Sequence, residues 1–369
     1  MKKTQTWIWQ DKNWPNFVFN ELKTSHIYQC FGQLEMAAKL LNPIDVKRLK
    51  AQNFELEAIA TSALEGETLS HSSLKASIYT HLGLGNMADK KDVQTDALLT
   101  LLIDAKNTDE PLSPARLFAW HQGLFPSQKK LTYPIHKGVY RHNKKEELRI
   151  ISGTWEKEVL HYLAPPASKV EFEMNRFLLW LNTENKLDPI IKSAIAHIWF
   201  LLIHPFEDGN RRLARDISDH VLSFGTNIPT ELFTLAFEIN EHKNEFYETL
   251  DSLSSSNNLD ISKWISWYIN ILSLSLKHAL KRVQDIKHKA LFWDKIQGLS
   301  LNARQRLVIS ALLNDAHKSQ KLKTSLYASL YKTSKPTASR DLKDLYIKKI
   351  LQVKGRGRGV YYELMLPYL

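Results

Sequence analysis

Apolar residues recur at helical spacing along most of the chain, and short β-like runs interrupt this pattern near its middle and at its end. The periodicity predicts helices over residues 28–50, 54–64, 95–104, 114–124, 170–181, 188–203 and 212–224. The runs 148–153 and 159–162 flank a polar turn and predict one hairpin. The pattern therefore predicts a mainly α protein with a hairpin inserted near its middle.

The C-terminal part of the chain has a pattern of its own. Helices are predicted over 303–313 and 322–331, and Pro336 opens a third that runs to about residue 349. Two strands, 350–353 and 360–363, then flank the loop Gly355-Arg356-Gly357-Arg358-Gly359. Three helices followed by a basic hairpin are typical of a winged helix-turn-helix, and we expect one as a separate domain over 291–369.

Basic residues concentrate in this domain. The 369 residues carry a formal net charge of +11. From Asn302 onward there are 14 Lys or Arg against 4 Asp or Glu, whereas the rest of the chain has 36 bases and 35 acids. Such an excess favours a polyanion partner, most often nucleic acid, although a merely soluble basic face is an alternative. The third helix has Ser339, Arg340, Lys343 and Lys348 at polar positions, where they could contact DNA. Winged helices also bind proteins, so the sequence leaves both partners open.

The overall composition is that of a globular protein, with 43% hydrophobic and 24% charged residues. One cysteine, Cys30, excludes an intramolecular disulfide framework and a multi-cysteine zinc site. The N-terminus lacks the apolar core of a signal peptide, and the most apolar run, 198–203, is far shorter than the ~20 residues of a membrane span. We therefore expect a cytoplasmic protein without a membrane partner. The aromatic N-terminal arm (Trp7, Trp9 and Trp14) should be buried.

Candidate chemistry lies in one stretch, His204-Pro205-Phe206-Glu207-Asp208-Gly209-Asn210-Arg211-Arg212-Leu213-Ala214-Arg215. Arg212 and Arg215, three positions apart, share a face in the first turns of a helix whose free N–H groups attract anions. Their guanidinium groups match the oxygens of a polyphosphate. Asp208 can hold Mg²⁺, and His204 can take a proton from an attacking hydroxyl. The stretch therefore favours transfer of a phosphorus group from a nucleotide to a hydroxyl.

At every defined position, this stretch matches the motif HxFx(D/E)GNxRxxR, so the chain resembles the Fic family. The resemblance implies a Fic helical core over 91–290, after an N-terminal region over 1–90. It also implies that the hairpin is a flap that aligns a target segment. The flap residues are Ile150, Ile151, Ser152 and Gly153.

For the chemistry, the resemblance implies transfer of AMP from ATP to Ser, Thr or Tyr hydroxyls of proteins. His204 is then the general base, and Asp208 is the Mg²⁺ ligand. The residues implied to bind ATP are Glu65, Asp208, Gly209, Asn210, Arg211, Arg212, Arg215 and Tyr247. The target protein, automodification and a homodimer stay open.

Arg211 departs from many AMP-transferring relatives, which have glycine at this position. Doc-type relatives carry lysine there and transfer the γ-phosphate, so a Doc-like phosphotransferase is one alternative. Because Arg215 is present, and Doc-type motifs lack it, AMP transfer is favoured, with Arg211 free to point to solvent. A second alternative is a DNA-binding regulator whose Fic core senses a nucleotide without turnover.

The segment Thr61-Ser62-Ala63-Leu64-Glu65-Gly66 resembles the inhibitory motif (S/T)xxxE(G/N) of many Fic proteins. Thr61 and Glu65 are four positions apart and share a helix face, and Gly66 ends the helix. By itself this is also an ordinary helix end with an exposed glutamate. The resemblance implies that Glu65 pairs with Arg215 and keeps the γ-phosphate away. A role of Glu65 in removing AMP is a lesser alternative.

Overall fold

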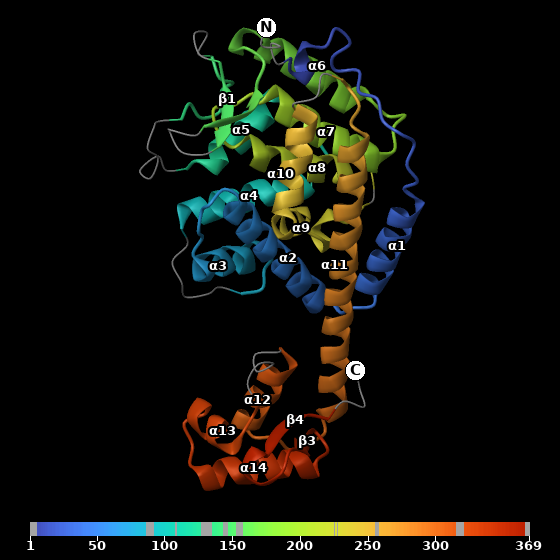
Figure 1. The fold of residues 1–369 in the computed structure, drawn as a ribbon. Coiled ribbons are helices and arrows are strands. Elements are labelled where there is room, and N and C mark those ends of the chain that lie inside the picture. The colour runs from blue at the N-terminus through green and yellow to red at the C-terminus, as the bar shows by residue number, and fades with distance from the viewer. Residues whose placement is uncertain are drawn as a thin grey trace. The chain divides into compact units, whose positions relative to one another are not determined.

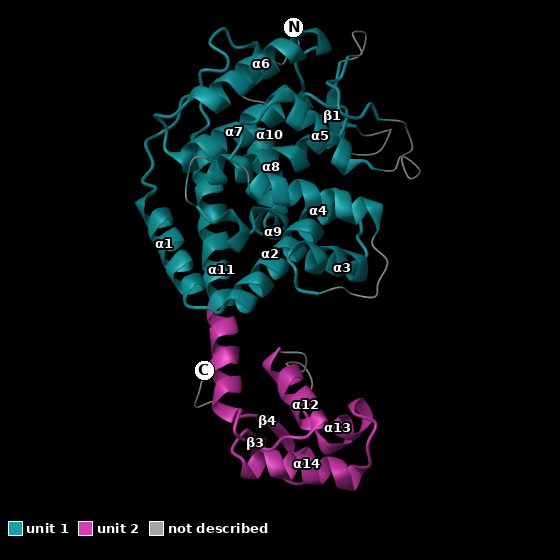
Figure 2. Ribbon diagram, turned by 180° about the vertical axis from the view of Figure 1, so that it is seen from behind, with its two compact units in different colours: residues 1–283 teal, residues 284–369 magenta. Residues whose placement is uncertain are grey.

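The computed structural model (Figure 1) describes residues 6–85, 92–107, 109–126, 135–142, 147–152, 158–224, 226, 228–254, 258–314 and 321–365. The chain divides into two compact units, residues 1–283 and 284–369 (Figure 2). We describe each unit by itself. The predicted domain boundaries at residues 90 and 290 stay predictions. No helix in the described ranges is long and apolar enough to cross a membrane.

The first unit is built from helices, in agreement with the predicted fold class. Most are short or of medium length, and the longest, α11, continues into the second unit. They are α1 (Ser25–Lys39), α2 (Pro43–Leu64), α3 (His71–His81), α4 (Val93–Lys106), α5 (Pro114–Leu124), α6 (Ala167–Thr183), α7 (Pro189–Ile203), α8 (Asn210–Ser223), α9 (Leu235–Glu241), α10 (Lys243–Ser254) and α11 (Ser262–Ile296).

The predicted hairpin is present in this unit. Strand β1 (Arg149–Ser152) pairs antiparallel with β2 (Val159–Leu163), with a register shift after Ile150. Ile150 and Ile151 therefore lie on the hairpin as predicted. Gly153, the last predicted flap residue, lies outside the described residues.

The first two helices begin and end at residues that the periodicity does not predict. Instead of breaking between residues 50 and 54, the chain breaks after α1, and α2 is continuous to Leu64. The Asn42 side chain accepts a hydrogen bond from the Asp45 N–H (2.9 Å), and Pro43 occupies the first helical position. An N-cap followed by proline starts a helix at this point, so the pattern of apolar residues alone is misleading here.

Helices α7 and α8 form the centre of the first unit. They pack against each other, α4 packs on α8, and α6 packs on α7. Every side chain of α8 from Arg212 to Leu222 is buried, although half of them are polar or charged. Buried polar groups need partners, and those of α8 find many of theirs on α2 and α4.

The aromatic arm packs onto this unit, as expected. Trp7 and Trp14 are buried. The indole N–H of Trp14 donates to the Glu173 carboxylate (3.0 Å), and that of Trp9 donates to the Leu163 carbonyl oxygen (2.7 Å). The indole N–H groups are thus paired while the rings cover apolar surface.

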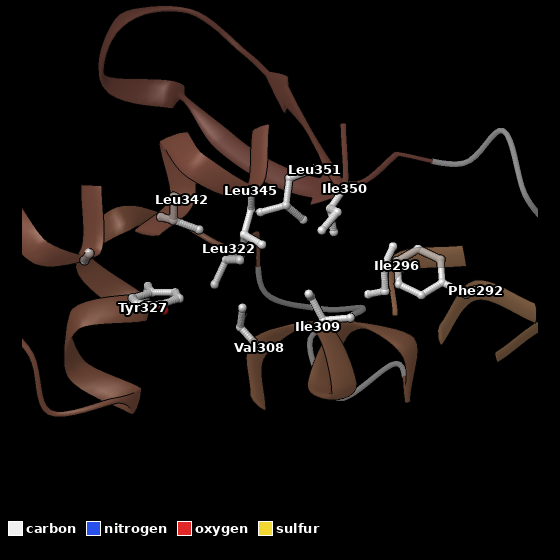
Figure 3. Packing of buried hydrophobic residues seen from close by; sticks show 11 residues of the cluster. Phe292, Ile296, Val308, Ile309, Leu322, Tyr327, Leu342, Leu345, Ile350 and Leu351 are labelled. Carbon is white, nitrogen blue, oxygen red and sulfur yellow. The ribbon is translucent and has the colours of Figure 1, made fainter. Parts of the chain in front are cut away.

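The second unit contains α12 (Ala303–Leu313), α13 (Thr324–Leu330), α14 (Lys335–Ile347), β3 (Leu351–Lys354) and β4 (Tyr361–Leu364). The two strands pair antiparallel. The unit has a hydrophobic core of its own, to which each of these three helices and the end of α11 contribute (Figure 3). The order of elements is the predicted one, and its assignment as a winged helix-turn-helix stays a prediction.

Candidate active site

A cavity of about 530 Å³ lies at the N-terminal end of α8. Its walls come from the end of α2, from β1, from the loop between α7 and α8, and from α10. Glu65, Ile150, Ile151 and Tyr247 line it, as do the loop residues His204 and 207–211. The structure thus brings most of the predicted site residues to one cavity of a size that small-molecule sites commonly have.

His204 caps the C-terminus of α7 in a left-handed conformation, with φ at 51°. Arg141, which the sequence analysis does not single out, holds this strained turn. Its Nε donates to the His204 carbonyl oxygen (2.7 Å), and its backbone N–H donates to the Pro205 carbonyl oxygen (2.9 Å). Because Arg141 is buried and bonded to the backbone on both sides of the turn, it positions His204 at the cavity wall.

The surroundings of His204 keep its ring neutral and leave one ring nitrogen without a proton. Its Nδ1 lies 3.2 Å from the Leu201 carbonyl oxygen, which can only accept, so we assign the ring proton to Nδ1. Nε2 is then left with a free lone pair. Burial, together with the positive charge of Arg141, lowers the pKa of His204 to about 3. The imidazole is therefore neutral near pH 7.

Two side chains fix the loop that follows His204. The Asn210 side chain accepts from the Phe206 N–H (2.9 Å) and donates to the Phe206 carbonyl oxygen (2.8 Å). The Phe206 ring is fully buried and stacks on His121, with ring centroids 4.1 Å apart. Asn210 thus lines the cavity while its side-chain amide closes the loop, a structural role beyond the ATP binding that the resemblance implies for it.

Gly209 is required where the loop enters α8. Its φ is 80°, a conformation that L side chains rarely adopt. A Cβ atom at this position would also lie 3.0 Å from the Leu124 side chain and 3.1 Å from the Phe125 ring. The glycine therefore lets the first turn of α8, with its free N–H groups, reach the cavity.

Asp208 is the exposed acid of the loop and lines the cavity. Among the described residues, no group of three or more His, Cys, Asp or Glu could hold a metal by itself. Mg²⁺ commonly binds through one or two carboxylates, with substrate phosphates and water as its other ligands. One carboxylate beside an anion site fits that form of binding.

Arg211 and Arg215 both contact Glu65. Arg211 Nη2 lies 2.6 Å from Glu65 Oε2, and Arg215 Nη2 lies 3.3 Å from Oε1. Arg215 also donates to the Thr61 hydroxyl from Nη2 (2.7 Å) and Nε (3.1 Å). The predicted pair of Glu65 with Arg215 is present. The option that Arg211 points to solvent is wrong, because its guanidinium makes the shorter bond to Glu65.

A second carboxylate, Glu67, holds the remaining arginine of the motif. Arg212 Nη1 lies 3.1 Å from Glu67 Oε1 and 3.2 Å from Oε2, and the guanidinium lies over the Phe125 ring. The sequence analysis does not identify Glu67. Arg212 and Arg215 are buried and do not line the cavity, whereas Glu65 and Arg211 do.

The arginines around Glu65 keep its carboxylate ionised at neutral pH. Burial by itself would raise the pKa of Glu65, but the guanidinium groups of Arg215 and Arg211 lower it below its usual value. Glu65 is therefore ionised when it meets these arginines. Gly66, with φ at 72°, directly follows and ends α2 as predicted.

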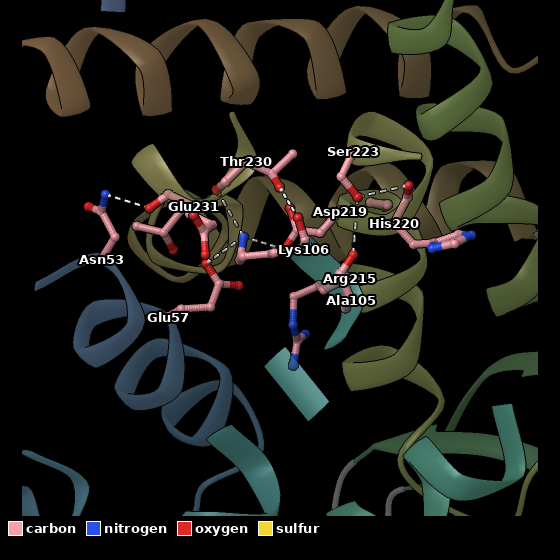
Figure 4. Close-up of polar contacts among 12 residues, drawn as sticks. Asn53, Glu57, Ala105, Lys106, Arg215, Asp219, His220, Ser223, Thr230 and Glu231 are labelled. Atoms are coloured by element: carbon pink, nitrogen blue, oxygen red, sulfur yellow. Dashed lines mark hydrogen bonds and ion pairs between the residues drawn. The ribbon is translucent and has the colours of Figure 1, made fainter. Parts of the chain in front are cut away.

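Behind the site, a buried polar cluster joins α2, α4 and α8 (Figure 4). Lys106 Nζ lies 2.6 Å from Asp219 Oδ2 and 4.0 Å from Glu57 Oε2, and all three side chains are almost fully buried. Burial would lower the pKa of Lys106, but Asp219 and Glu57 raise it, so the lysine stays charged. The cluster fixes α2, which carries Thr61, to α8, which carries Arg215.

Comparison with family models assigns two regions of the chain. Residues 111–222 match the Fic/DOC family, and residues 7–84 match a domain of unknown function, DUF4172. The Fic match includes α7 and most of α8, with the whole motif of residues 204–215.

The curated relatives are named protein adenylyltransferases. A probable protein adenylyltransferase of Aquifex aeolicus is 26% identical over 165 residues, which are 39% of this chain and 50% of that protein. A protein adenylyltransferase of Caenorhabditis elegans is 26% identical over 178 residues, 46% of this chain and 32% of that protein. The matches thus span half or less of each relative.

Solved structures share the fold. A Fic family protein from Desulfovibrio desulfuricans is 18% identical, with a TM-score of 0.53, and the match covers 94% of this chain and 98% of that one. A Fic domain containing signaling protein from Bacteroides thetaiotaomicron is 21% identical, with a TM-score of 0.50, over 70% and 96% of the two chains. These likenesses confirm the predicted mainly α fold.

Proposed function

Because residues 111–222 form a Fic/DOC family domain, we propose that this protein transfers AMP from ATP to hydroxyl groups of proteins and that it is held in an inhibited state. The observation that carries the proposal is the meeting, at one cavity, of a neutral His204, Asp208 and the N-terminal end of α8, where Arg211 lines the cavity and Arg212 and Arg215 are buried in the following turns. The names of the curated relatives support the same chemistry.

In the transfer step, the target hydroxyl oxygen attacks the α-phosphorus of ATP. A new P–O bond forms, the bond from the α-phosphorus to the bridging oxygen breaks, and pyrophosphate leaves. Nε2 of His204 accepts the hydroxyl proton. When bound, Mg²⁺ neutralises charge on the phosphate oxygens, and Asp208 is the residue that would hold it. The side chains of Ile150 and Ile151 line the cavity on the flap side, where a target segment would enter.

The contacts of α2 support inhibition of this step. The arginines that would bind the phosphates of ATP are all occupied: Arg211 and Arg215 by Glu65, and Arg212 by Glu67. Phosphate oxygens can take these guanidinium groups only if the carboxylates leave, because like charges at such distances repel. The inhibited state is thus a competition between two carboxylates and a polyphosphate for the same arginines.

Label transfer from ATP tests this function. The purified full chain is incubated with Mg²⁺ and ATP labelled at either the α- or the γ-phosphate. We expect α-label in protein, and we expect Glu65→Gly to raise it by about 5- to 150-fold, the range of a coupling free energy of about 1–3 kcal/mol. Glu65→Gln, which keeps the size but removes the charge, isolates the electrostatic part of the effect.

His204→Ala is the control for catalysis and should abolish the label in both backgrounds. Entry of γ-label alone would contradict AMP transfer and favour a Doc-like phosphotransferase, for which Arg211 would be the decisive residue. No label from either position, even with Glu65→Gly and a whole-cell extract as the source of targets, would favour a regulator that senses nucleotide without turnover.

A further inference from the structure

Basic side chains in the second unit outnumber the acids that could neutralise them. From residue 302 onward, each described acid already holds one base: Asp341 holds Arg304 (2.9 Å), Asp344 holds Lys348 (2.5 Å) and Glu363 holds Lys354 (3.5 Å). The other described bases there are exposed and form no ion pair with a described residue. They are Arg306, Lys321, Lys323, Lys332, Lys335, Arg340, Lys343, Lys349 and Arg356.

Several of these bases lie on one face of α14. Ala338, Leu342 and Leu345 of this helix are buried in the core of the unit (Figure 3). The exposed positions Lys335, Ser339 and Lys343 recur every four residues, and Arg340 is exposed beside them. At 3.6 residues per turn, these positions form a continuous stripe on the side away from the core.

The two acids of α14 are already engaged by groups outside this stripe. Asp341 is buried, where it accepts hydrogen bonds from Asn302 (2.9 Å) and from the Tyr327 hydroxyl (3.0 Å) as well as pairing with Arg304. Asp344 accepts from Gln305 (2.8 Å) of α12. Both carboxylates of α14 thus have partners of their own, Asp344 with Lys348 as well, and neither forms an ion pair with Lys335, Arg340 or Lys343 of the stripe.

A tight turn presents α14 to solvent. Only residues 331–334 separate α13 from α14, and the turn is made by Lys332, which adopts a positive φ of 45°. Ser334 then caps α14 by accepting a hydrogen bond from the Thr337 N–H (3.3 Å). Two helices joined by so short a turn, with the second exposed, have the arrangement of helix-turn-helix proteins that place this helix in the major groove.

The loop between β3 and β4 adds a second basic element next to α14, because β3 packs against that helix. Gly355 has φ at 83°, and a Cβ there would lie 2.4 Å from the Gly359 carbonyl oxygen, so the loop needs this glycine to close. Arg356 at its tip is exposed. The loop therefore has a defined conformation and carries the positive charge of Arg356 beside α14.

We propose that this surface, formed by the outer stripe of α14 and the loop 355–359, binds duplex DNA. The inference does not depend on the proposed AMP transfer. Charge complementarity favours a phosphate backbone, and the first turns of α14 present hydrogen-bond donors that suit base edges. The exposed apolar residues Tyr346 and Ile347 lie in its last turn, away from the end that helix-turn-helix proteins insert into the groove.

Fluorescence anisotropy of a labelled random-sequence duplex, titrated with the full chain at several salt concentrations, tests the proposal. We expect binding that weakens with salt. The double variant Arg340→Gln/Lys343→Gln should lose at least about tenfold in affinity, and its salt slope should fall by about 2, one for each lost contact. As a matched control, Lys12→Gln/Lys23→Gln removes two exposed charges of the first unit and should change affinity less than about twofold.

Circular dichroism verifies that both double variants fold, and His204→Ala should bind DNA like the wild type. If the wild type does not bind the duplex at about 50 mM salt, the proposal is overturned. Equal losses in the two double variants would also overturn it, because the attraction would then be a property of the whole chain rather than of this face.

Discussion

The two units of this protein handle charge in opposite ways. In the first unit, α8 buries Arg212, Arg215 and Asp219 beside the apolar residues of α7, and each has partners from distant parts of the chain. In the described part of the second unit the core is mostly apolar, with Asp341 as its buried acid, and most bases lie on the surface without an ion-pair partner among the described residues. One region pairs its charges internally, and the other leaves them available to a partner.

This difference separates two kinds of functional charge. A buried charge is costly unless it is paired, so the arginines of α8 can serve a phosphate only after Glu65 and Glu67 have been displaced. An exposed lysine costs little, and it can meet a polyanion without any rearrangement of the fold. We therefore expect phosphate binding in the first unit to be controlled by Glu65 and Glu67. In the second unit we expect polyanion binding that depends on salt.

Lowering the pH should produce the largest difference in stability between the two units. His121, His197 and His220 of the first unit are fully buried, and burial lowers their pKa values to about 4, 3 and 3, from 6.5 when unfolded. Below pH 6.5 these histidines thus bind more protons in the unfolded chain than in the folded one. Their contribution to the unfolding free energy therefore decreases as the pH is lowered. We expect each histidine to cost about 2 kcal/mol at pH 5.

Hydrogen exchange detected by mass spectrometry, corrected for intrinsic rates, measures this effect in each unit separately. Protection in the first unit should fall between pH 7 and pH 5, but less than the histidines alone would cause, because burial raises the pKa values of Asp216 and Asp219 and protonation of these carboxyls favours the folded state. The described part of the second unit has one histidine, His288, which is only half-buried, so its protection should change less. Equal losses of protection in the two units would contradict the prediction that buried histidines make the first unit more sensitive to acid.

Removal of the buried lysine should have the next largest effect. Lys106→Met leaves Asp219 and Glu57 buried without their cation, which should lower the unfolding free energy by about 3–5 kcal/mol. Lys343→Met, an exposed position of the second unit, should change it by less than about 0.5 kcal/mol. Thermal and urea unfolding measure both.

A second substitution keeps this prediction falsifiable. Asp219→Asn in the Lys106→Met background removes a stranded negative charge and should restore part of the lost stability. If the single Lys106→Met variant is as stable as the wild type, the buried cluster does not hold α2 on α8.

The pair of Glu67 with Arg212 is intermediate between a buried ion pair and an exposed charge, because the Glu67 side chain is 33% exposed and that of Arg212 is 5% exposed. Water screens such a pair in part, so Glu67→Gln should raise AMP incorporation by only about 2- to 5-fold, less than the change at Glu65. Glu35→Gln, on α1, is the control, because Glu35 pairs with the exposed Lys39 instead of an arginine of α8. Activity equal to or below that of the wild type would exclude Glu67 from the inhibition.

The fold is largely predictable where local patterns dominate. The hairpin, α7 and the order of elements in the second unit follow from periodicity and turn residues. The start of α2 is not predicted, because the cap at Asn42 and Pro43 overrides a continuous pattern of apolar residues. The sequence analysis also predicts no helix where the structure has α3, α9, α10 and α11.

The site is predictable to the extent that its residues are contiguous. His204, Asp208 and Gly209 lie in one motif, so their common location follows from the chain itself. Arg141 and Lys106 are missed because each acts through residues distant in sequence. The only local signal for Lys106 is a lysine that closes the apolar run of α4, and that pattern is common at helix C-termini.

The sequence by itself determined the residue types of the site and of the inhibitory segment, because a helix places residues at fixed spacing on one face. Only the tertiary structure decided how their charges pair. Arg211 meets Glu65, and Arg212 meets Glu67, because α2 ends beside the first turn of α8. Such contacts depend on packing between elements, and no spacing along the chain encodes it.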